Sequence, residues 1–269
     1  MTEYVDKSSR PFFIDSHAHL ELDPLSRDPE AVVARAVAAG VGAMVTIGID
    51  LADARNALDI ADRIDCVYAG VGFHPHNAKD VGDDGLVKME HLARHPKVVG
   101  YGEIGLDFFR NRSPRDSQIR VFQDQLHLAK RLGKPVVIHL RDAYREGLDM
   151  LERSAPFPER GVIHCFSGDE NDAKRALDLG FFISIPGTVT YKKNTKLRDI
   201  VGHLPEDRIL LETDCPFLAP EPLRGKDNEP AYMVHTATKV AEVRGVSLEA
   251  IARVTTANAV RLFGLPLPC

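Results

Sequence analysis

The 269-residue sequence lacks any apolar run that approaches the roughly 20 residues needed to cross a bilayer. Its first residues also lack the basic-then-apolar pattern of a secretory signal, so we expect a cytoplasmic protein with no membrane partner. The four cysteines show no Cys-x-x-Cys spacing, and three of them, Cys66, Cys165 and Cys215, lie in apolar, strand-like runs. These three are expected to be reduced core thiols. The net charge of −5 argues against nucleic-acid binding through overall charge but allows a local basic patch.

Short apolar runs recur along the chain, and several are apolar on both sides of the β alternation. Such runs are typical of parallel strands that are covered on both faces. Segments with helical periodicity lie between them, and residues 28–40, for example, begin with acidic side chains and end at a glycine. The eight runs are residues 12–15, 43–49, 66–73, 98–106, 135–140, 161–166, 181–187 and 209–214.

Eight strands that alternate with helices predict an α/β fold, a (β/α)8 TIM barrel. No low-complexity linker or change of composition interrupts the pattern, so residues 1–269 are expected to form a single domain. An open doubly wound sheet is the alternative. Its glycine-rich phosphate loop is absent here, because residues 14–22 contain no glycine after the first run. The barrel is therefore favoured, and its functional side chains are expected at the carboxyl ends of the strands.

Polar side chains occur where several of these apolar runs end. His17 and His19 are two residues apart, so both rings can converge on one point if the chain is extended there. Burying an unpaired carboxylate or imidazole in such surroundings costs on the order of several kcal/mol, and a nearby cation removes that cost. Imidazole and carboxylate ligands suit several divalent metals and do not choose among Mg, Mn, Zn, Fe and Ni. The six predicted metal ligands are His17, His19, Glu103, His139, His164 and Asp214.

Eight motifs follow one another in an order that resembles a known family. They are "DSHAHL", "GFHPH", "GEIGLDFFR", "PVVIHLRDA", "HCFSG", "ETDCPFLAP", "NEPAY" and "NAVRLFG". Over nearly the whole chain, the sequence is similar to the TatD-type metal-dependent deoxyribonucleases, which belong to the amidohydrolase-like barrels. One departure is Asp227, which precedes "NEPAY" where the family often has arginine.

The resemblance implies two divalent metal ions, with Glu103 as the carboxylate that bridges them. It also places His74 near the substrate phosphate. The implied ligands are His17, His19, Glu103 and Asp214 for one ion, and Glu103, His139 and His164 for the other.

Two divalent cations about 3.5–4 Å apart suit hydrolysis of a phosphodiester, because they make hydroxide available near neutral pH and neutralise charge on the phosphoryl oxygens. We expect Asp214 to accept the proton of the attacking water. His74 is expected either to donate to a phosphoryl oxygen or to assist the leaving group. The predicted substrate is DNA, as single strands or ends. A small amide, lactone or ester hydrolysed on the same barrel is the alternative, and a non-catalytic metal-dependent binding protein is disfavoured.

An anionic substrate requires basic side chains around the barrel mouth. Loops that follow predicted strands supply the expected phosphate contacts, Arg110, Arg112, Arg141, Lys192 and Lys193, and further basic residues at Arg224 and Lys226. Phe108 and Phe109 could stack on a base, although two phenylalanines beside a strand are more often part of the core. The sequence does not decide the oligomeric state and is compatible with a monomer.

Overall fold

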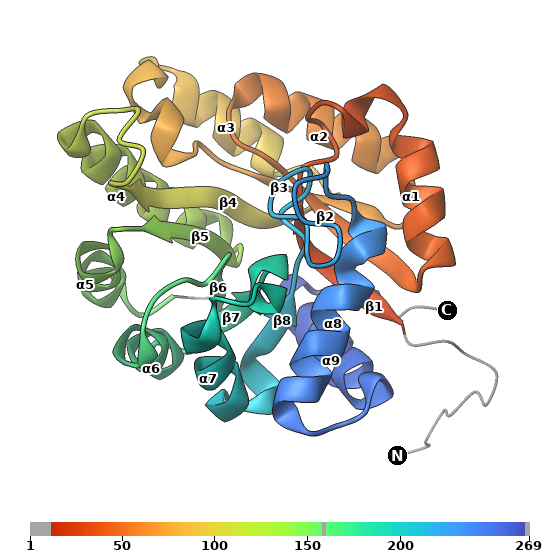
Figure 1. Ribbon diagram of the computed structural model, residues 1–269. Coiled ribbons are helices and arrows are strands. Elements are labelled where there is room, and N and C mark those ends of the chain that lie inside the picture. Colours follow the sequence, from red (N-terminus) through yellow and green to blue (C-terminus); the bar gives the residue numbers. More distant parts are fainter. Residues whose placement is uncertain (1–11, 158–159, 267–269) are drawn as a thin grey trace.

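The computed structural model describes residues 12–157 and 160–266 and has the predicted (β/α)8 barrel architecture (Figure 1). Parallel strands are hydrogen-bonded to one another in chain order, which excludes the doubly wound alternative because that fold reverses its strand order. The strands are β1 (Phe13–Ala18), β2 (Val41–Gly48), β3 (Val67–Val71), β4 (Val98–Asp107), β5 (Val136–Arg141), β6 (Gly161–Ile163), β7 (Phe182–Ile185) and β8 (Ile209–Leu211).

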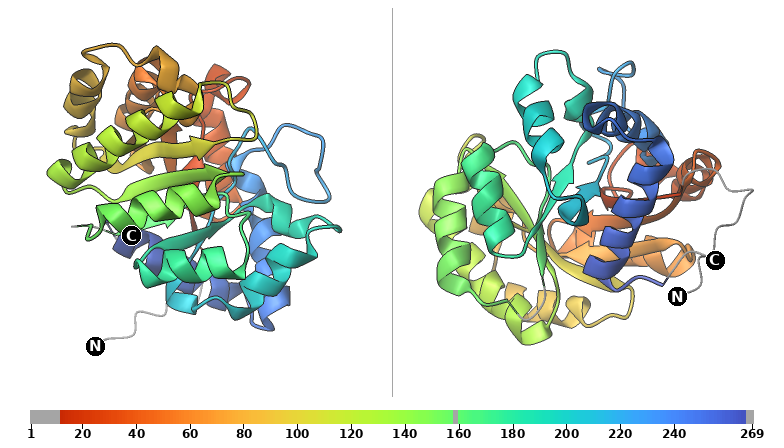
Figure 2. Two further views of the ribbon diagram at one scale, coloured as in Figure 1. Left: turned by 90° about the vertical axis from the view of Figure 1, so that its left-hand side faces the viewer. Right: turned by 90° about the horizontal axis from the view of Figure 1, so that it is seen from below.

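Helices surround these strands in all three views (Figures 1 and 2). Several begin where a side chain caps the first turn: Asp50 accepts from the backbone N–H groups of Ala52 and Asp53 at the start of α2. None of the described helices is long and apolar enough to cross a membrane. The helices are α1 (Pro29–Ala38), α2 (Leu51–Arg63), α3 (Gly85–Ala93), α4 (Arg115–Leu132), α5 (Tyr144–Ser154), α6 (Glu170–Asp178), α7 (Thr195–His203), α8 (Met233–Arg244) and α9 (Leu248–Phe263).

The three described cysteines are free thiols. Cys215 is buried, whereas Cys66 and Cys165 are partly buried. Cys269 lies outside the described residues. The expectation of core thiols therefore fits Cys215 best.

Two apolar clusters stabilise the barrel. The larger lies between the strands and the helices, and the smaller combines strand residues with the end of α9. In the smaller cluster, Val137 of β5 and Val162 of β6 pack with Phe263 of α9. His139 and His164 follow those valines by two residues, so they lie on the same side of the strands and nearer the carboxyl ends. The smaller apolar cluster therefore packs directly beneath His139 and His164 and fixes the strands that carry them.

The barrel closes between β8 and β1 through side chains and loop backbone, because these two strands do not pair as neighbours in the described sheet. Buried Asp15 accepts from the backbone N–H of Thr213 at 3.0 Å and from its hydroxyl at 2.5 Å. Beyond it, Asp214 N–H donates to the carbonyl of His17 at 2.9 Å, and His19 N–H donates to the carbonyl of Cys215 at 2.8 Å. These bonds hold the segment after β8 against the end of β1.

Gly105 allows β4 to approach β5 beside the polar side chains. Its φ is +146°, and a Cβ added there would lie 2.0 Å from the carbonyl oxygen of His139. We expect Gly105→Ala to lower the free energy of unfolding by about 2 kcal/mol or more, because both the backbone conformation and the strand spacing must change. Chemical denaturation of the purified variant measures the loss.

Gly202 is the matched control for this substitution. It lies in α7, and a Cβ added there would meet only Val243, at 3.9 Å. Gly202→Ala is expected to leave stability unchanged or raise it by about 0.5–1 kcal/mol, because alanine favours the helix. Equal stability of the two variants would contradict the close approach of β4 and β5.

Candidate metal centre

The six predicted ligands converge at the carboxyl ends of the strands, around the buried carboxylate of Glu103 on β4. Glu103 Oε1 lies 2.6 Å from His139 Nδ1 and 2.9 Å from His164 Nε2, while Oε2 lies 3.4 Å from His17 Nε2. On the other side, Asp214 Oδ1 lies 3.7 Å from His17 Nε2 and 3.5 Å from His19 Nε2. Residues from five strands or from the segments directly after them, up to 197 positions apart in the sequence (17 to 214), thus meet in one cluster, in which His139 and Asp214 are partly exposed and the other four are buried.

The ligand atoms fall into three overlapping groups in which all atoms lie within 4.8 Å of one another. Glu103 belongs to two of them, as the resemblance implies for a bridging carboxylate. His74 joins one group, although it was expected near the phosphate rather than among the ligands. The groups are His17, His19 and Asp214; His17, Glu103 and His164; and His74, Glu103 and His139.

The chemistry of these side chains fits a divalent cation. His17 Nε2 and His19 Nε2 lie only 3.2 Å apart, and both face the same oxygen of Asp214. His19 Nδ1 lies 2.9 Å from the carbonyl of Ile47 and 3.0 Å from Glu21 Oε1, so Nδ1 carries a proton, and in the neutral form of the ring the Nε2 lone pair is directed toward the cluster. Two imidazole nitrogens and a carboxylate oxygen around one point are a donor set for borderline divalent metals.

The carboxylates and imidazoles of the cluster strongly shift one another's pKa values. Burial favours the neutral form of Glu103, yet the neighbouring imidazoles of His164, His74 and His139 hold the pKa of its carboxyl well below the usual value. Burial likewise opposes a charged ring at His164, yet the carboxylates of Glu103 and Glu212 raise its pKa well above the usual value. The buried negative charge therefore requires positive partners, which are protons on imidazole or cations in their place.

Three buried carboxylates that sequence reasoning missed face the outer nitrogens of cluster histidines. Such carboxylate–histidine pairs orient the ring and make the inner nitrogen a better ligand. The pairs are His19 with Glu21 (Nδ1 to Oε1, 3.0 Å), His139 with Asp107 (Nε2 to Oδ2, 3.4 Å) and His164 with Glu212 (Nδ1 to Oε1, 3.5 Å). The available signal was spacing, because each carboxylate stands two or four residues from a predicted ligand: Glu21 from His19, Asp107 from Glu103, and Glu212 from Asp214.

His74 precedes the 3-10 helix Pro75–Asp80 and points its ring into the cluster. Its Nδ1 accepts from the backbone N–H of His76 at 3.0 Å, and its Nε2 lies 3.4 Å from Glu103 Oε1. A backbone N–H can only donate, so the neutral ring of His74 carries its proton on Nε2 and donates into the site. Burial lowers the pKa of His74 to about 4.

The five predicted phosphate-contacting side chains are exposed, and none forms an ion pair with another described residue. Arg141 ends β5, two residues after His139, and Arg110 donates its backbone N–H to buried Asp107 at 2.7 Å. These two therefore lie beside the cluster. The other three are Arg112, Lys192 and Lys193.

Arg224 and Lys226, predicted as further basic residues of the mouth, are exposed in the loop after β8. Arg224 lies over the ring of Tyr191 and reaches Glu221 at 4.0 Å, so its charge already has a partner. Asp227 is exposed too. The Arg224 guanidinium is thus less available to an anion than the side chains beside β4 and β5.

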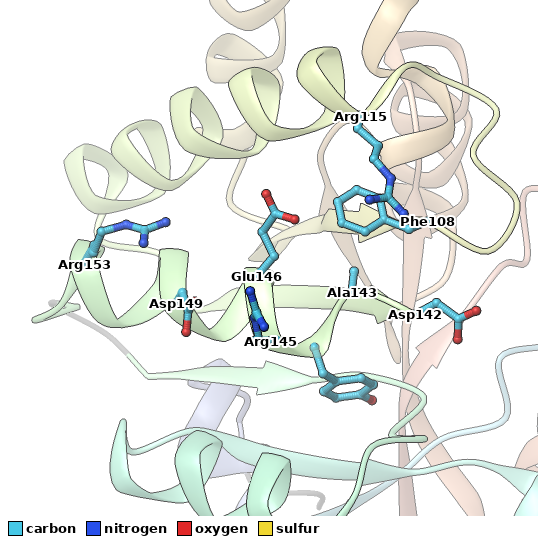
Figure 3. Close-up of a pocket in the computed structure, with 9 residues that line it drawn as sticks. Phe108, Arg115, Asp142, Ala143, Arg145, Glu146, Asp149 and Arg153 are labelled. Atoms are coloured by element: carbon cyan, nitrogen blue, oxygen red, sulfur yellow. The ribbon is translucent and has the colours of Figure 1, made fainter.

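A groove of about 470 Å³ lies between α4 and α5, and its lining contains none of the cluster residues (Figure 3). Its charged lining is balanced, with Arg115, Arg145 and Arg153 against Asp142, Glu146 and Asp149. Nothing in this balance favours an anion. The polar cluster at the barrel mouth is therefore the better candidate for chemistry.

A buried imidazole and carboxylate cluster at the mouth of a (β/α)8 barrel is typical of metal-dependent hydrolases. The sequence profile described as TatD related DNase matches residues 14–264. The chain therefore belongs to the TatD-related DNase family.

Relatives cover almost the whole chain. A Bacillus subtilis protein named uncharacterized metal-dependent hydrolase YabD is 40% identical over 249 residues, which are 93% of this chain and 98% of that protein. The 3'-5' ssDNA/RNA exonuclease TatD of Citrobacter koseri is 36% identical, over 93% of this chain and 98% of that protein. The crystal structure of YJJV, a TatD homolog from Escherichia coli K12, has a TM-score of 0.90 and 34% identity, and covers 94% of this chain and 98% of its own. The predicted family, a TatD-type metal-dependent hydrolase, is confirmed.

Glu212 offers a direct test of the carboxylates behind the histidines. Glu212→Gln keeps the size of the side chain, and its amide oxygen can still accept from the backbone N–H of Cys165. It removes the negative charge that faces His164 Nδ1, so we expect the affinity for Zn²⁺ or Mn²⁺ to fall about 10- to 100-fold. Metal titration followed by calorimetry measures the change.

Glu242→Gln is the control, because Glu242 is exposed on α8 and faces Lys239 rather than the cluster. It is expected to leave metal affinity unchanged. If Glu212→Gln bound metal as tightly as Glu242→Gln does, Glu212 would have no part in orienting His164.

Proposed function

We propose that this protein is a metal-dependent deoxyribonuclease that hydrolyses phosphodiester bonds in single-stranded DNA or at DNA ends. The observation that carries the proposal is the buried Glu103 carboxylate among four imidazoles, beside basic side chains with no acidic partner in the part of the chain that the structure describes. A relative named 3'-5' ssDNA/RNA exonuclease over nearly the same length supports the substrate class. A cytoplasmic location remains a prediction.

The residues that would hold two divalent ions are the six predicted ligands, with Glu103 between the two positions. Bound there, such ions would supply positive charge for the phosphoryl oxygens and make hydroxide available near neutral pH. The donor atoms leave the identity of the ions open among Mg, Mn, Zn, Fe and Ni. The six are His17, His19, Glu103, His139, His164 and Asp214.

Asp214 is the proposed proton acceptor for the attacking water. Its side chain is 14% exposed, compared with 4% for Glu103, so of these two carboxylates it is the one that water can reach. The backbone bond from Asp214 N–H to the carbonyl of His17 fixes its position at the rim. A carboxylate held at hydrogen-bonding distance from the reacting water is suited to general-base catalysis.

His74 is the proposed hydrogen-bond donor to a phosphoryl oxygen. The backbone N–H of His76 occupies its Nδ1, so the proton on Nε2 is fixed in direction and points toward the cluster. A preorganised donor of this kind stabilises charge that develops on a substrate oxygen. Of the two roles predicted for His74, this geometry supports donation to the phosphate.

Arg110 and Arg141 are proposed to position the phosphates that flank the reacting one. Arg110 follows the end of β4 by three residues and Arg141 ends β5, and neither has an acidic partner among the described residues. Exposed unpaired cations attract a polyanion locally even though the whole chain is negative. Arg112, Lys192 and Lys193, which are also exposed, stay predicted phosphate contacts.

The proposal predicts that purified protein with added Mg²⁺ or Mn²⁺ degrades single-stranded DNA and that a chelator abolishes the activity. His139→Ala is expected to abolish the activity too, because it removes one of the side chains that would hold a metal ion together with Glu103.

Asp214→Asn is expected to reduce kcat about 100-fold or more through loss of the general base. Gel assays on labelled oligonucleotides measure all three.

A panel of lactones, esters and amides is the comparison set. Hydrolysis of that panel with no action on DNA would replace the proposal by the small-substrate alternative. Full turnover by Asp214→Asn with metal still bound would remove Asp214 as the proton acceptor and leave the nuclease assignment in place.

A further inference from the structure

Two phenylalanine rings are unusually exposed for this chain. Phe109 is 55% exposed and Phe217 is 52% exposed, whereas the other phenylalanine and tyrosine side chains among the described residues are buried or partly buried. The other large exposed apolar residues are Val37, Val87 and Val246, of which Val37 and Val87 lie on helices. An exposed aromatic ring is a ready surface for a ligand, because burial of its area is favourable.

Phe217 lies beside one side of the metal centre. It follows Asp214 by three residues, and its ring centroid is 6.1 Å from that of His19 at an interplanar angle of 68°. Its backbone is fixed, since Phe217 N–H donates to the carbonyl of Asp214 and its carbonyl accepts from buried Asn228 Nδ2 at 2.7 Å. The ring is thus held at the His17, His19 and Asp214 group.

Phe109 lies beside the other side of the centre, where β4 and β5 end. It follows buried Asp107 by two residues, and the Arg141 guanidinium lies 4.1 Å from its ring centroid. Arg141 in turn follows His139 by two residues on β5. The ring therefore stands next to the His74, Glu103 and His139 group, with an unpaired cation stacked on it.

Phe108 does not share these properties. It is only partly exposed and packs against the main apolar cluster. A guanidinium lies over each of the two rings, Arg115 at 4.2 Å from that of Phe108 (Figure 3) and Arg141 at 4.1 Å from that of Phe109, so burial alone separates them. Of the two neighbouring phenylalanines, Phe108 belongs to the core and Phe109 faces solvent.

We propose that Phe109 and Phe217 are base-stacking platforms on opposite sides of the metal centre, each holding an unstacked base next to the reacting phosphate. This inference rests on the proposed phosphodiester hydrolysis. In a barrel ordered β1 to β8, the junction of β4 and β5 lies across from the junction of β8 and β1, so the two rings face a strand that extends past the centre in both directions. Duplex DNA keeps its base faces stacked, whereas a single strand offers them, and stacking is sequence-tolerant.

The test compares a single-stranded oligonucleotide with a chain of the same length made of abasic tetrahydrofuran residues, which keeps the phosphates and lacks the bases. With Mn²⁺ present, Phe109→Leu and Phe217→Leu are each expected to raise KM on the oligonucleotide about 5- to 150-fold, the range of one lost base stack. KM on the abasic chain is expected to stay unchanged. Phe109→Trp and Phe217→Trp are expected to restore KM, because an aromatic face is regained.

Val87→Ala is the matched control, since Val87 is 68% exposed on α3, a helix that supplies no residue of the cluster. It is expected to change neither KM. Unchanged KM on the oligonucleotide in both leucine variants would overturn the platforms while the nuclease assignment stands. Equal losses on both substrates would also overturn them, because the rings would then support the centre rather than the bases. Hydrolysis of neither substrate by the unmodified protein would overturn the proposed function itself.

Discussion

The carboxylate of Glu103 is the charge on which the rest of the site depends. It is buried at the mouth of the barrel and lies within 3.5 Å of nitrogens from His17, His74, His139 and His164. A buried anion is tolerated only when positive or donating partners surround it. The imidazoles that meet this requirement are also the ligands of divalent metals, so the same arrangement that makes the buried charge acceptable prepares a metal centre.

Two sets of contacts hold Glu103's neighbours in place: an apolar cluster under the strands, and hydrogen bonds between β1 and the segment after β8. The small apolar cluster that includes α9 fixes β5 and β6 two residues before His139 and His164. Asp15 fastens Thr213 to β1, which brings Asp214 to His17 and His19. The carboxylates of Glu21, Asp107 and Glu212 then orient the imidazole rings of the cluster. Because these supporting contacts lie on rigid strands and beside them, the positions of the cluster side chains are fixed closely.

The sequence predicted the barrel and the meeting of the six ligands well, because apolar runs and polar strand ends are local signals. Closure through Asp15 and the outer partners such as Glu212 depend on contacts across nearly 200 and nearly 50 residues, respectively. Spacing hints at such residues, but only the folded chain shows what they face.

Anomalous diffraction from crystals grown with Mn²⁺ or Zn²⁺ would show directly whether divalent ions bind at Glu103. We expect two peaks at the barrel mouth, each within bonding distance of a Glu103 oxygen and of ring nitrogens from the cluster. His139 and His164 would then direct their inner nitrogens to the ions instead of to the carboxylate. Saturating metal with no peak at Glu103, and with that carboxylate still hydrogen-bonded to both histidines, would contradict this expectation.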